Sequence, residues 1–178
     1  TFFHMIKNSK KNLLNESNLY NNILLLSRNK FFYLNCDLID NFQNRIFLIF
    51  VHISFIIIKM KQKNKNESVE KFNQNIFDLI FNKIELNMRE LGYGDTTINK
   101  KMKLLVKNFY NILFFCENYK DKTIESRKEF FLNYFNLNNK ENTNNNSNLV
   151  DYFNKYQSFC FDLSVDSVLK GDLNFKYK

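Results

Sequence analysis

Apolar residues recur every three or four positions through most of the 178-residue chain. Over Glu70–Leu91 and Ile98–Leu113 this spacing places the apolar side chains on one face, which is typical of amphipathic helices. The same spacing predicts helices over 19–28, 124–135 and 149–163, and the asparagine-rich stretch 138–148 predicts a loop. We therefore predict an all-α fold, a single helical domain of about six helices.

The most hydrophobic stretch is Ile46 to Ile58, which also contains His52 and Ser54. Thirteen residues of helix reach about 20 Å, short of the roughly 30 Å hydrocarbon core of a bilayer. The run therefore predicts a buried helix. Its basic flank, Lys59 to Lys65, leaves peripheral contact with an anionic membrane open as an alternative.

Two of the three glycines, Gly92 and Gly94, lie between the two longest amphipathic segments. Glycine adopts positive φ at little cost, so both are expected to form a helix C-cap and its exit turn. Asp95 and the two threonines after it are expected to cap the second helix. The predicted unit is a helical hairpin with a central glycine turn.

Charged residues crowd this turn, with Arg89 and Glu90 before it and Lys100 and Lys101 after it. One interpretation is purely structural, in which the glycines only close the hairpin. The other is a polar docking surface at the end of the hairpin.

His52 and Arg45 are seven residues apart, so on a helix they share a face about 10 Å apart. Either His52 is a core histidine with satisfied hydrogen bonds and Arg45 pairs with Asp40 or Glu90, or the two residues form a recognition site.

The composition predicts a large hydrophobic core, because 44% of the residues are hydrophobic and 21 are phenylalanine. The three cysteines, Cys36, Cys116 and Cys160, are odd in number and widely spaced, which predicts neither a disulfide framework nor a zinc site. Cys116 and Cys160 are expected to be buried reduced thiols. The chain has no P-loop, dinucleotide fingerprint, H-E-x-x-H or nucleophile elbow, so we predict no enzymatic activity and no cofactor.

The formal charge of +8, carried mostly by lysine, favours an acidic partner such as ribosomal RNA or an anionic membrane. A basic helical domain that binds the ribosome or RNA, or a peripheral membrane protein, is therefore the alternative to any more specific function.

With the residues laid out, the chain resembles the ubiquinol-cytochrome c chaperone family over roughly 27–175. The resemblance rests on an R-E-x-G-x-G-D turn with its basic stretch and F-Y pair, on an upstream F-Y pair, a D-x(4)-R motif and a histidine, and on a closing segment with L-x-G-x(3)-F. These are Arg89, Glu90, Gly92, Gly94, Asp95, Lys100, Lys101, Phe109 and Tyr110; Phe32, Tyr33, Asp40, Arg45 and His52; and Tyr152, Leu169, Gly171 and Phe175. Asn44 replaces a glycine of the pattern, and we expect it in a left-handed conformation.

The resemblance implies a chaperone-like helical domain over 27–178, preceded by a partly flexible segment and first helix over 1–26. It implies binding of newly made cytochrome b during assembly of ubiquinol-cytochrome c reductase (complex III), near the ribosomal exit, in a groove that the surplus phenylalanines would line. Whether a small partner protein is needed, as in mitochondrial relatives, stays open. The candidate binding residues are Asp40, Arg45, His52, Arg89, Glu90, Gly92, Gly94, Asp95, Lys100, Lys101 and Tyr110.

A bacterial member of the family would work in the cytoplasm beside the inner membrane, and a mitochondrial one on the matrix side of its inner membrane. The lack of an Arg-rich, Ser-rich leader favours the bacterial case.

Overall fold

A computed structural model describes residues 2–63, 67–139 and 143–177, with side chains over 14–62, 67–139 and 146–177. Its helices are α1 (Phe2–Ser27), α2 (Lys30–Leu34), α3 (Phe42–Lys63), α4 (Glu67–Glu90), α5 (Asp95–Glu117), a 3-10 turn η1 (Tyr119–Asp121), α6 (Ile124–Tyr134), α7 (Thr143–Asp162) and α8 (Val165–Leu169). Within these ranges there is no strand, only an isolated antiparallel bridge between Leu38 and Leu137. The all-α prediction is confirmed, and six of the described helices have eleven residues or more.

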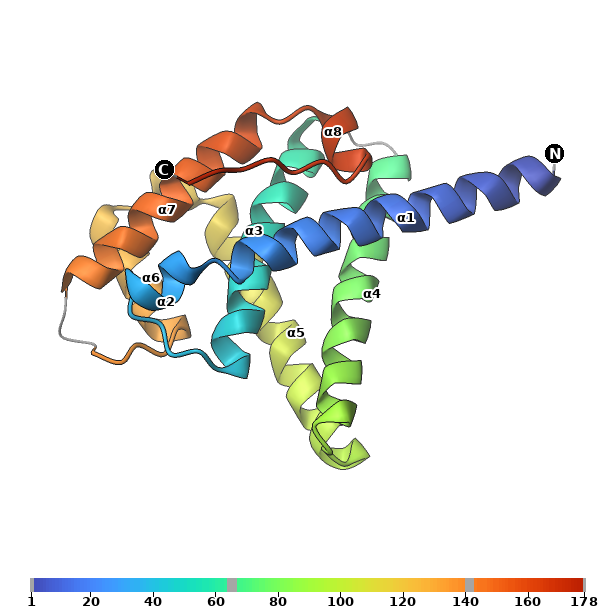
Figure 1. Cartoon of the computed structure of the whole chain (residues 1–178). Coiled ribbons are helices and arrows are strands. Elements are labelled where there is room, and N and C mark those ends of the chain that lie inside the picture. Colours follow the sequence, from blue (N-terminus) through green and yellow to red (C-terminus); the bar gives the residue numbers. More distant parts are fainter. Residues whose placement is uncertain (1, 64–66, 140–142, 178) are drawn as a thin grey trace.

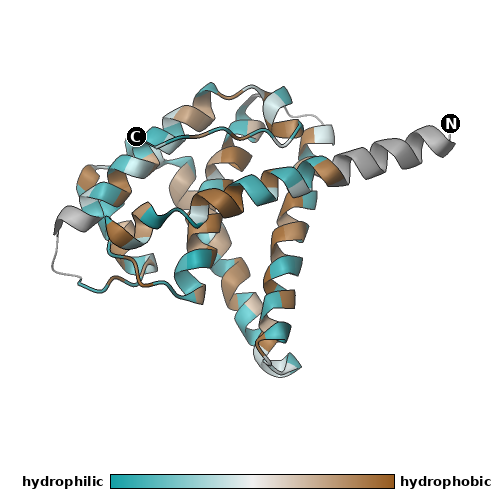
Figure 2. Cartoon of the chain, in the orientation of Figure 1, coloured by the Kyte–Doolittle hydropathy of each residue, from teal (hydrophilic) through white to brown (hydrophobic). Residues whose placement is uncertain are grey.

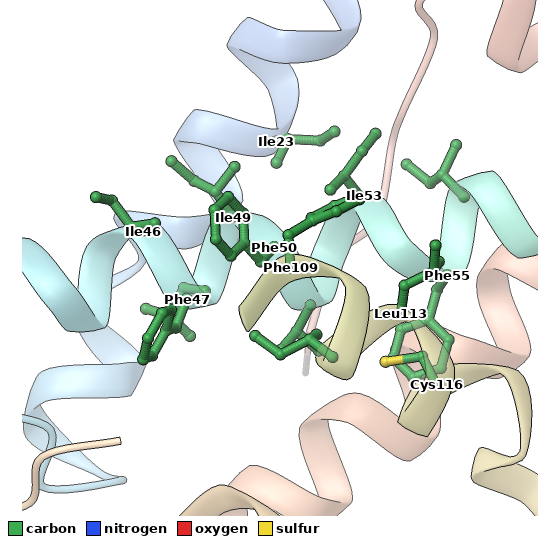
Figure 3. Packing of buried hydrophobic residues seen from close by; sticks show 14 of the residues in the cluster. Ile23, Ile46, Phe47, Ile49, Phe50, Ile53, Phe55, Phe109, Leu113 and Cys116 are labelled. Atoms are coloured by element: carbon green, nitrogen blue, oxygen red, sulfur yellow. The ribbon is translucent and has the colours of Figure 1, made fainter. Parts of the chain in front are cut away.

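Helix α3 is the centre of the fold and packs against α1, α4, α5, α7 and α8 (Figure 1). Figure 3 shows the contact with α5, where Phe50 lies beside Phe109 and Phe55 lies near Leu113 and Cys116. Of the described helices, α3 alone is long and apolar enough to cross a bilayer, but 78% of its most apolar window is buried inside the protein. This confirms the prediction of a buried helix, and extends it beyond the 13-residue apolar run.

Phenylalanine rings form much of the interior. The ring of Phe50 lies 5.5 Å from that of Phe81 and 5.3 Å from that of Phe109, and Phe131 stacks on Phe153 at 5.2 Å. Burying one phenylalanine ring contributes roughly 1.5–3 kcal/mol to the stability of the fold, so most rings of a Phe-rich chain are expected in the core. Phe77 and Phe109 also line a cavity of about 550 Å³ between α3, α4 and α5, so a phenylalanine-lined hollow exists, and its use by a client stays a prediction.

Helix α1 belongs to the common core, because Leu19 and Ile23 have no exposed surface. It ends at Ser27, beside the predicted boundary at residue 26. The flexibility predicted for the first residues concerns side chains outside the described part.

Gly171 holds the C-terminal segment against α1. Its φ is +79°, and its N–H and that of Asp172 bond the carbonyls of Val168 and Ser167, the pattern of a Schellman motif that ends α8. A Cβ atom here would stand 2.4 Å from the backbone oxygen of Asn15. Only glycine lets the two backbones approach this closely.

Asn44 overturns one expectation. It lies inside α3 and is fully buried, not in a left-handed conformation. Its amide donates to the carbonyls of Ile39 (2.7 Å) and Asn136 (2.8 Å), and its oxygen accepts from the N–H of Asn136 (2.9 Å). The side chain thus satisfies backbone groups 92 residues away, which explains a buried polar residue here.

The predicted loop over 138–148 is also partly wrong, because α7 already begins at Thr143. Asn148, within that helix, donates to the carbonyl of Asn35 at 2.7 Å. Asn138 and Asn139 bond Asp37, which itself has φ of 59°. Residues 140–142 lie outside the described part.

Three glycine substitutions should separate these backbone roles. Gly171→Ala should destabilise by about 3 kcal/mol or more, since it adds a clash to the positive φ. Gly92→Ala should cost about 1 kcal/mol, because its φ of +83° is strained but the space around it is open. Gly94→Ala, with an ordinary φ and open space, should cost about 0.5 kcal/mol. Urea unfolding checks the order, and equal losses at Gly92 and Gly171 would contradict the packing argument.

Candidate functional site: a groove between α1, α3 and α4

A groove of about 530 Å³ opens where the C-terminal ends of α1 and α4 meet the start of α3. Its apolar lining includes Ile46, Ile49 and Ile84, which are buried, and Leu24 and Leu91. Four charged side chains line it as well: Arg28, Asp40, Arg45 and Glu90. We call this the α1–α3–α4 groove.

Asp40 and Arg45 form a bidentate ion pair in the groove. Arg45 Nε and Nη2 donate to the two Asp40 carboxylate oxygens at 2.6 and 2.8 Å. This hydrogen bonding lowers the pKa of the Asp40 carboxyl. Both side chains are about half exposed, at 52% each, so the pair adds little to stability and is accessible to a partner. The pairing predicted for Arg45 is confirmed, and Asp40 rather than Glu90 is the carboxylate.

Glu90 and Arg28 also line the groove, and neither forms an ion pair with any residue in the described ranges. Glu90 comes from the motif of the glycine turn. Arg28 was missed by the sequence reasoning, because nothing local links the end of α1 to the end of α4. The one feature of the sequence that points to Arg28 is its position directly after α1, a helix with apolar residues on its buried face.

The glycine turn closes the α4–α5 hairpin and lies at its far end (Figure 1). Gly92 N–H bonds Arg89 O and Tyr93 N–H bonds Met88 O, so Gly92 occupies the positive-φ position of a Schellman motif. Gly94 has φ of −74° and is the N-cap of α5, so the positive φ predicted for it is wrong.

Arg89 ties the two helices of the hairpin together. Its guanidinium donates to Glu85 Oε1 at 2.8 Å and to Asp95 Oδ1 at 2.6 Å. Asp95 therefore pairs across the turn, and the capping role predicted for it is wrong: no side chain caps the Gly94 N-terminus of α5. Asp95 is the first residue of α5 rather than its N-cap, and its carboxylate pairs with Arg89 instead.

Lys100, Lys101 and Tyr110 do not share the groove. The two lysines are exposed on α5, and Lys101 Nζ lies 5.2 Å from the centre of the Tyr93 ring. Tyr110 lines another cavity, of about 550 Å³ between α3, α4 and α5, together with Phe77 and Phe109. The structure thus divides the candidate residues among the groove, the hairpin tip and α5.

His52 is a core residue. Its Nδ1 lies 2.6 Å from Leu48 O, which can only accept, so Nδ1 carries the proton and Nε2 accepts from Tyr152 Oη at 2.8 Å. Burial lowers the pKa of His52 to about 4. With no exposed surface, His52 does not form a recognition site with the half-exposed Arg45, so that alternative is wrong.

The cysteines carry no evident chemistry. All three are buried, and burial raises the pKa of Cys36 and of Cys160 to about 12. A thiol with such a pKa is not a nucleophile at neutral pH.

Comparison with known proteins shows the family of the chain. The family model for the ubiquinol-cytochrome C chaperone matches residues 34–171. The chain therefore belongs to the ubiquinol-cytochrome C chaperone family, and the resemblance seen in the sequence is confirmed. Comparison with curated protein sequences gives no significant match.

The fold is similar to the crystal structure of the Cbp3 homolog from Brucella abortus. The TM-score is 0.81 at 20% sequence identity, over 99% of this chain and 97% of that one. At this identity the similarity shows the fold alone.

The buried His52 makes the stability of the protein pH-dependent. Its folded pKa is below the unfolded value of about 6.5, so the unfolded state binds the extra proton and stability falls as pH drops from about 6.5 toward 4. Wild type should lose about 2 kcal/mol more than His52→Gln between about pH 7 and about pH 5. Urea unfolding of both proteins tests this, and parallel pH profiles would show that His52 does not titrate as described.

Proposed function

We propose that this chain is an assembly chaperone for ubiquinol-cytochrome c reductase that binds newly made cytochrome b through the α1–α3–α4 groove. Membership of a ubiquinol-cytochrome C chaperone family supports the role in complex III assembly. The observation that carries the choice of site is the groove itself, where three charged residues of the family-like motifs, Asp40, Arg45 and Glu90, surround an apolar floor.

The size of the groove defines what it can hold. A volume of about 530 Å³ accommodates a few side chains, comparable to a small-molecule site, and not a whole membrane-spanning helix. The chaperone therefore holds a short segment of its client, with apolar side chains on the isoleucine floor. A loop or helix end of a membrane protein offers this combination of apolar and charged residues.

The charges at the rim select the orientation of that segment. Asp40 and Arg45 neutralise each other, whereas Arg28 and Glu90 have no ion-pair partner within the described residues. A client segment with an acidic group toward Arg28 and a basic group toward Glu90 would complete both pairs. Complementary charges of this kind set register and binding rate more than raw affinity.

The location follows from the client. A protein that receives cytochrome b as it is made works beside the inner membrane, in the bacterial cytoplasm or on the mitochondrial matrix side. Contact with the ribosome exit and with a small partner protein belongs to the same proposal.

Site-specific crosslinking tests the groove. A photoreactive residue at Leu91, which lines the groove and is 64% exposed, should crosslink newly made cytochrome b. Glu90→Lys should lower the crosslink on the order of tenfold, because it reverses the rim charge without touching the core. The matched controls are a photoreactive residue at Ile124, 55% exposed on α6, and the substitution Glu129→Lys on the same helix.

Haem spectra of membranes supply the second readout, and Glu90→Lys should selectively lower the reductase b-type haem relative to oxidase haem. Equal crosslinks at Leu91 and Ile124 would place the client elsewhere on the surface. If reductase haem were normal in a strain lacking the protein, the basic ribosome-binding alternative would replace the chaperone function.

A further inference from the structure

The outer face of α5 combines basic and apolar side chains and has no acidic residue. Residues 96–116 contain no Asp or Glu, and Lys100, Lys103 and Lys107 recur at helical spacing on the side opposite the core residues Leu105 and Phe109. All three lysines are exposed. No carboxylate in the described part of the chain forms an ion pair with them.

Apolar side chains continue the same stripe. Tyr110 and Phe114 follow Lys107 at steps of three and four residues and are 55% and 68% exposed, and Leu104 beside them is 57% exposed. Figure 2 shows polar and apolar residues alternating along this helix. A hollow of about 470 Å³ runs beside Lys103 and is lined by Met102 and Val106 as well. We call this surface the α5 outer face.

We propose that the α5 outer face is a membrane-docking surface that binds the headgroups of an anionic bilayer. The lysines attract anionic headgroups. Each lysine near the membrane surface adds to the binding free energy, because no carboxylate beside it competes for its charge. The exposed rings and Leu104 then bury apolar area at the boundary between headgroups and acyl chains. Long lysine stems suit this position, because the ammonium group reaches the headgroups while the stem lies along apolar surface.

Two other occupants fit the face less well. A second copy of the chain, related by a two-fold axis, would bring the same lysines against each other. Single-stranded RNA would use the lysines and stack on Tyr110 and Phe114, but it would leave Leu104 uncovered. The anionic bilayer alone satisfies the charge and covers both the aromatic and the aliphatic side chains.

This surface is separate from the client groove, which is lined by residues of α1, α3, α4 and the connection before α3. Membrane docking through α5 therefore leaves the groove free for a client. The proposal does not rest on cytochrome b binding, because the purified chain should dock on its own.

The chain has no tryptophan, so Phe114→Trp places a single reporter on the proposed surface. In this protein, vesicles of phosphatidylglycerol and phosphatidylcholine should shift the emission to the blue, and brominated lipids should quench it. Vesicles of phosphatidylcholine alone should do neither. Leu34→Trp, a reporter at an exposed position on α2, should be unaffected by either vesicle.

Flotation with the same vesicles tests the charges. Lys100→Gln, Lys103→Gln and Lys107→Gln together should weaken binding of the full chain about 100-fold at low salt. The control combines Lys83→Gln, Lys170→Gln and Lys176→Gln, which remove equal charge at exposed positions away from α5 and should bind like wild type. Circular dichroism of both variants confirms that each is folded.

Equal weakening by both triple variants would show a general charge effect and overturn the α5 proposal. So would an indole emission that stays unquenched when the Phe114→Trp protein meets anionic vesicles of brominated lipid. If the α5 triple variant floated normally but lost binding to ribosomes or single-stranded RNA, the face would be a nucleic-acid surface instead.

Discussion

Burial of the apolar side chains of α3 is the constraint on which the rest of the structure depends. A helix with apolar residues on every side is stable in water only if other helices cover all of it. Helices α1, α4, α5, α7 and α8 supply that cover, and their amphipathic faces follow from the need to meet it. The buried polar residues of α3 are tolerated because each finds a partner: Asn44 at Asn136, His52 at Tyr152, Ser54 at the carbonyl of Phe50, and Lys59 at the carbonyl of Phe161.

The groove is a consequence of that cover being incomplete at one end. Helix α1 ends at Ser27 and α4 at Glu90, both beside the start of α3, so a groove opens there with the nearly buried Ile46 and Ile49 at its base. The chain changes direction at these helix ends, and charged residues collect there because they remain hydrated. An apolar floor with a charged rim therefore follows from how the bundle terminates, and it offers a partner both kinds of contact.

The helices and the hairpin could be predicted from the sequence because they depend on residues that are neighbours along the chain. The helical spacing in 70–91 and 98–113 is such a local feature, and so is the positive φ of Gly92. What local pattern lacks is contact between distant segments. The bond from Asn44 to Asn136 and the approach of Gly171 to α1 join residues that are far apart in sequence, and Arg28 and Glu90 line one groove although they are 62 residues apart. Gly94 and Asp95 failed for a local reason, because α5 begins one residue earlier than a capping Asp95 requires, with Gly94 as its N-cap and Asp95 as its first residue.

The residues of the motif around the glycine turn fall into two groups: those with a structural role and one that is free to bind a partner. Gly92 provides the positive φ, Gly94 is the N-cap of α5, and Arg89 with Asp95 forms an exposed ion pair across the turn. Those four residues have structural roles that need no ligand. Glu90 is the exception: it is exposed, lines the groove, and has no ion-pair partner in the described part of the chain. A rigid turn that fixes the end of α4 also fixes the position of this carboxylate at the rim. The structural interpretation of the motif and the binding interpretation are therefore compatible, because the first orients the residue on which the second depends.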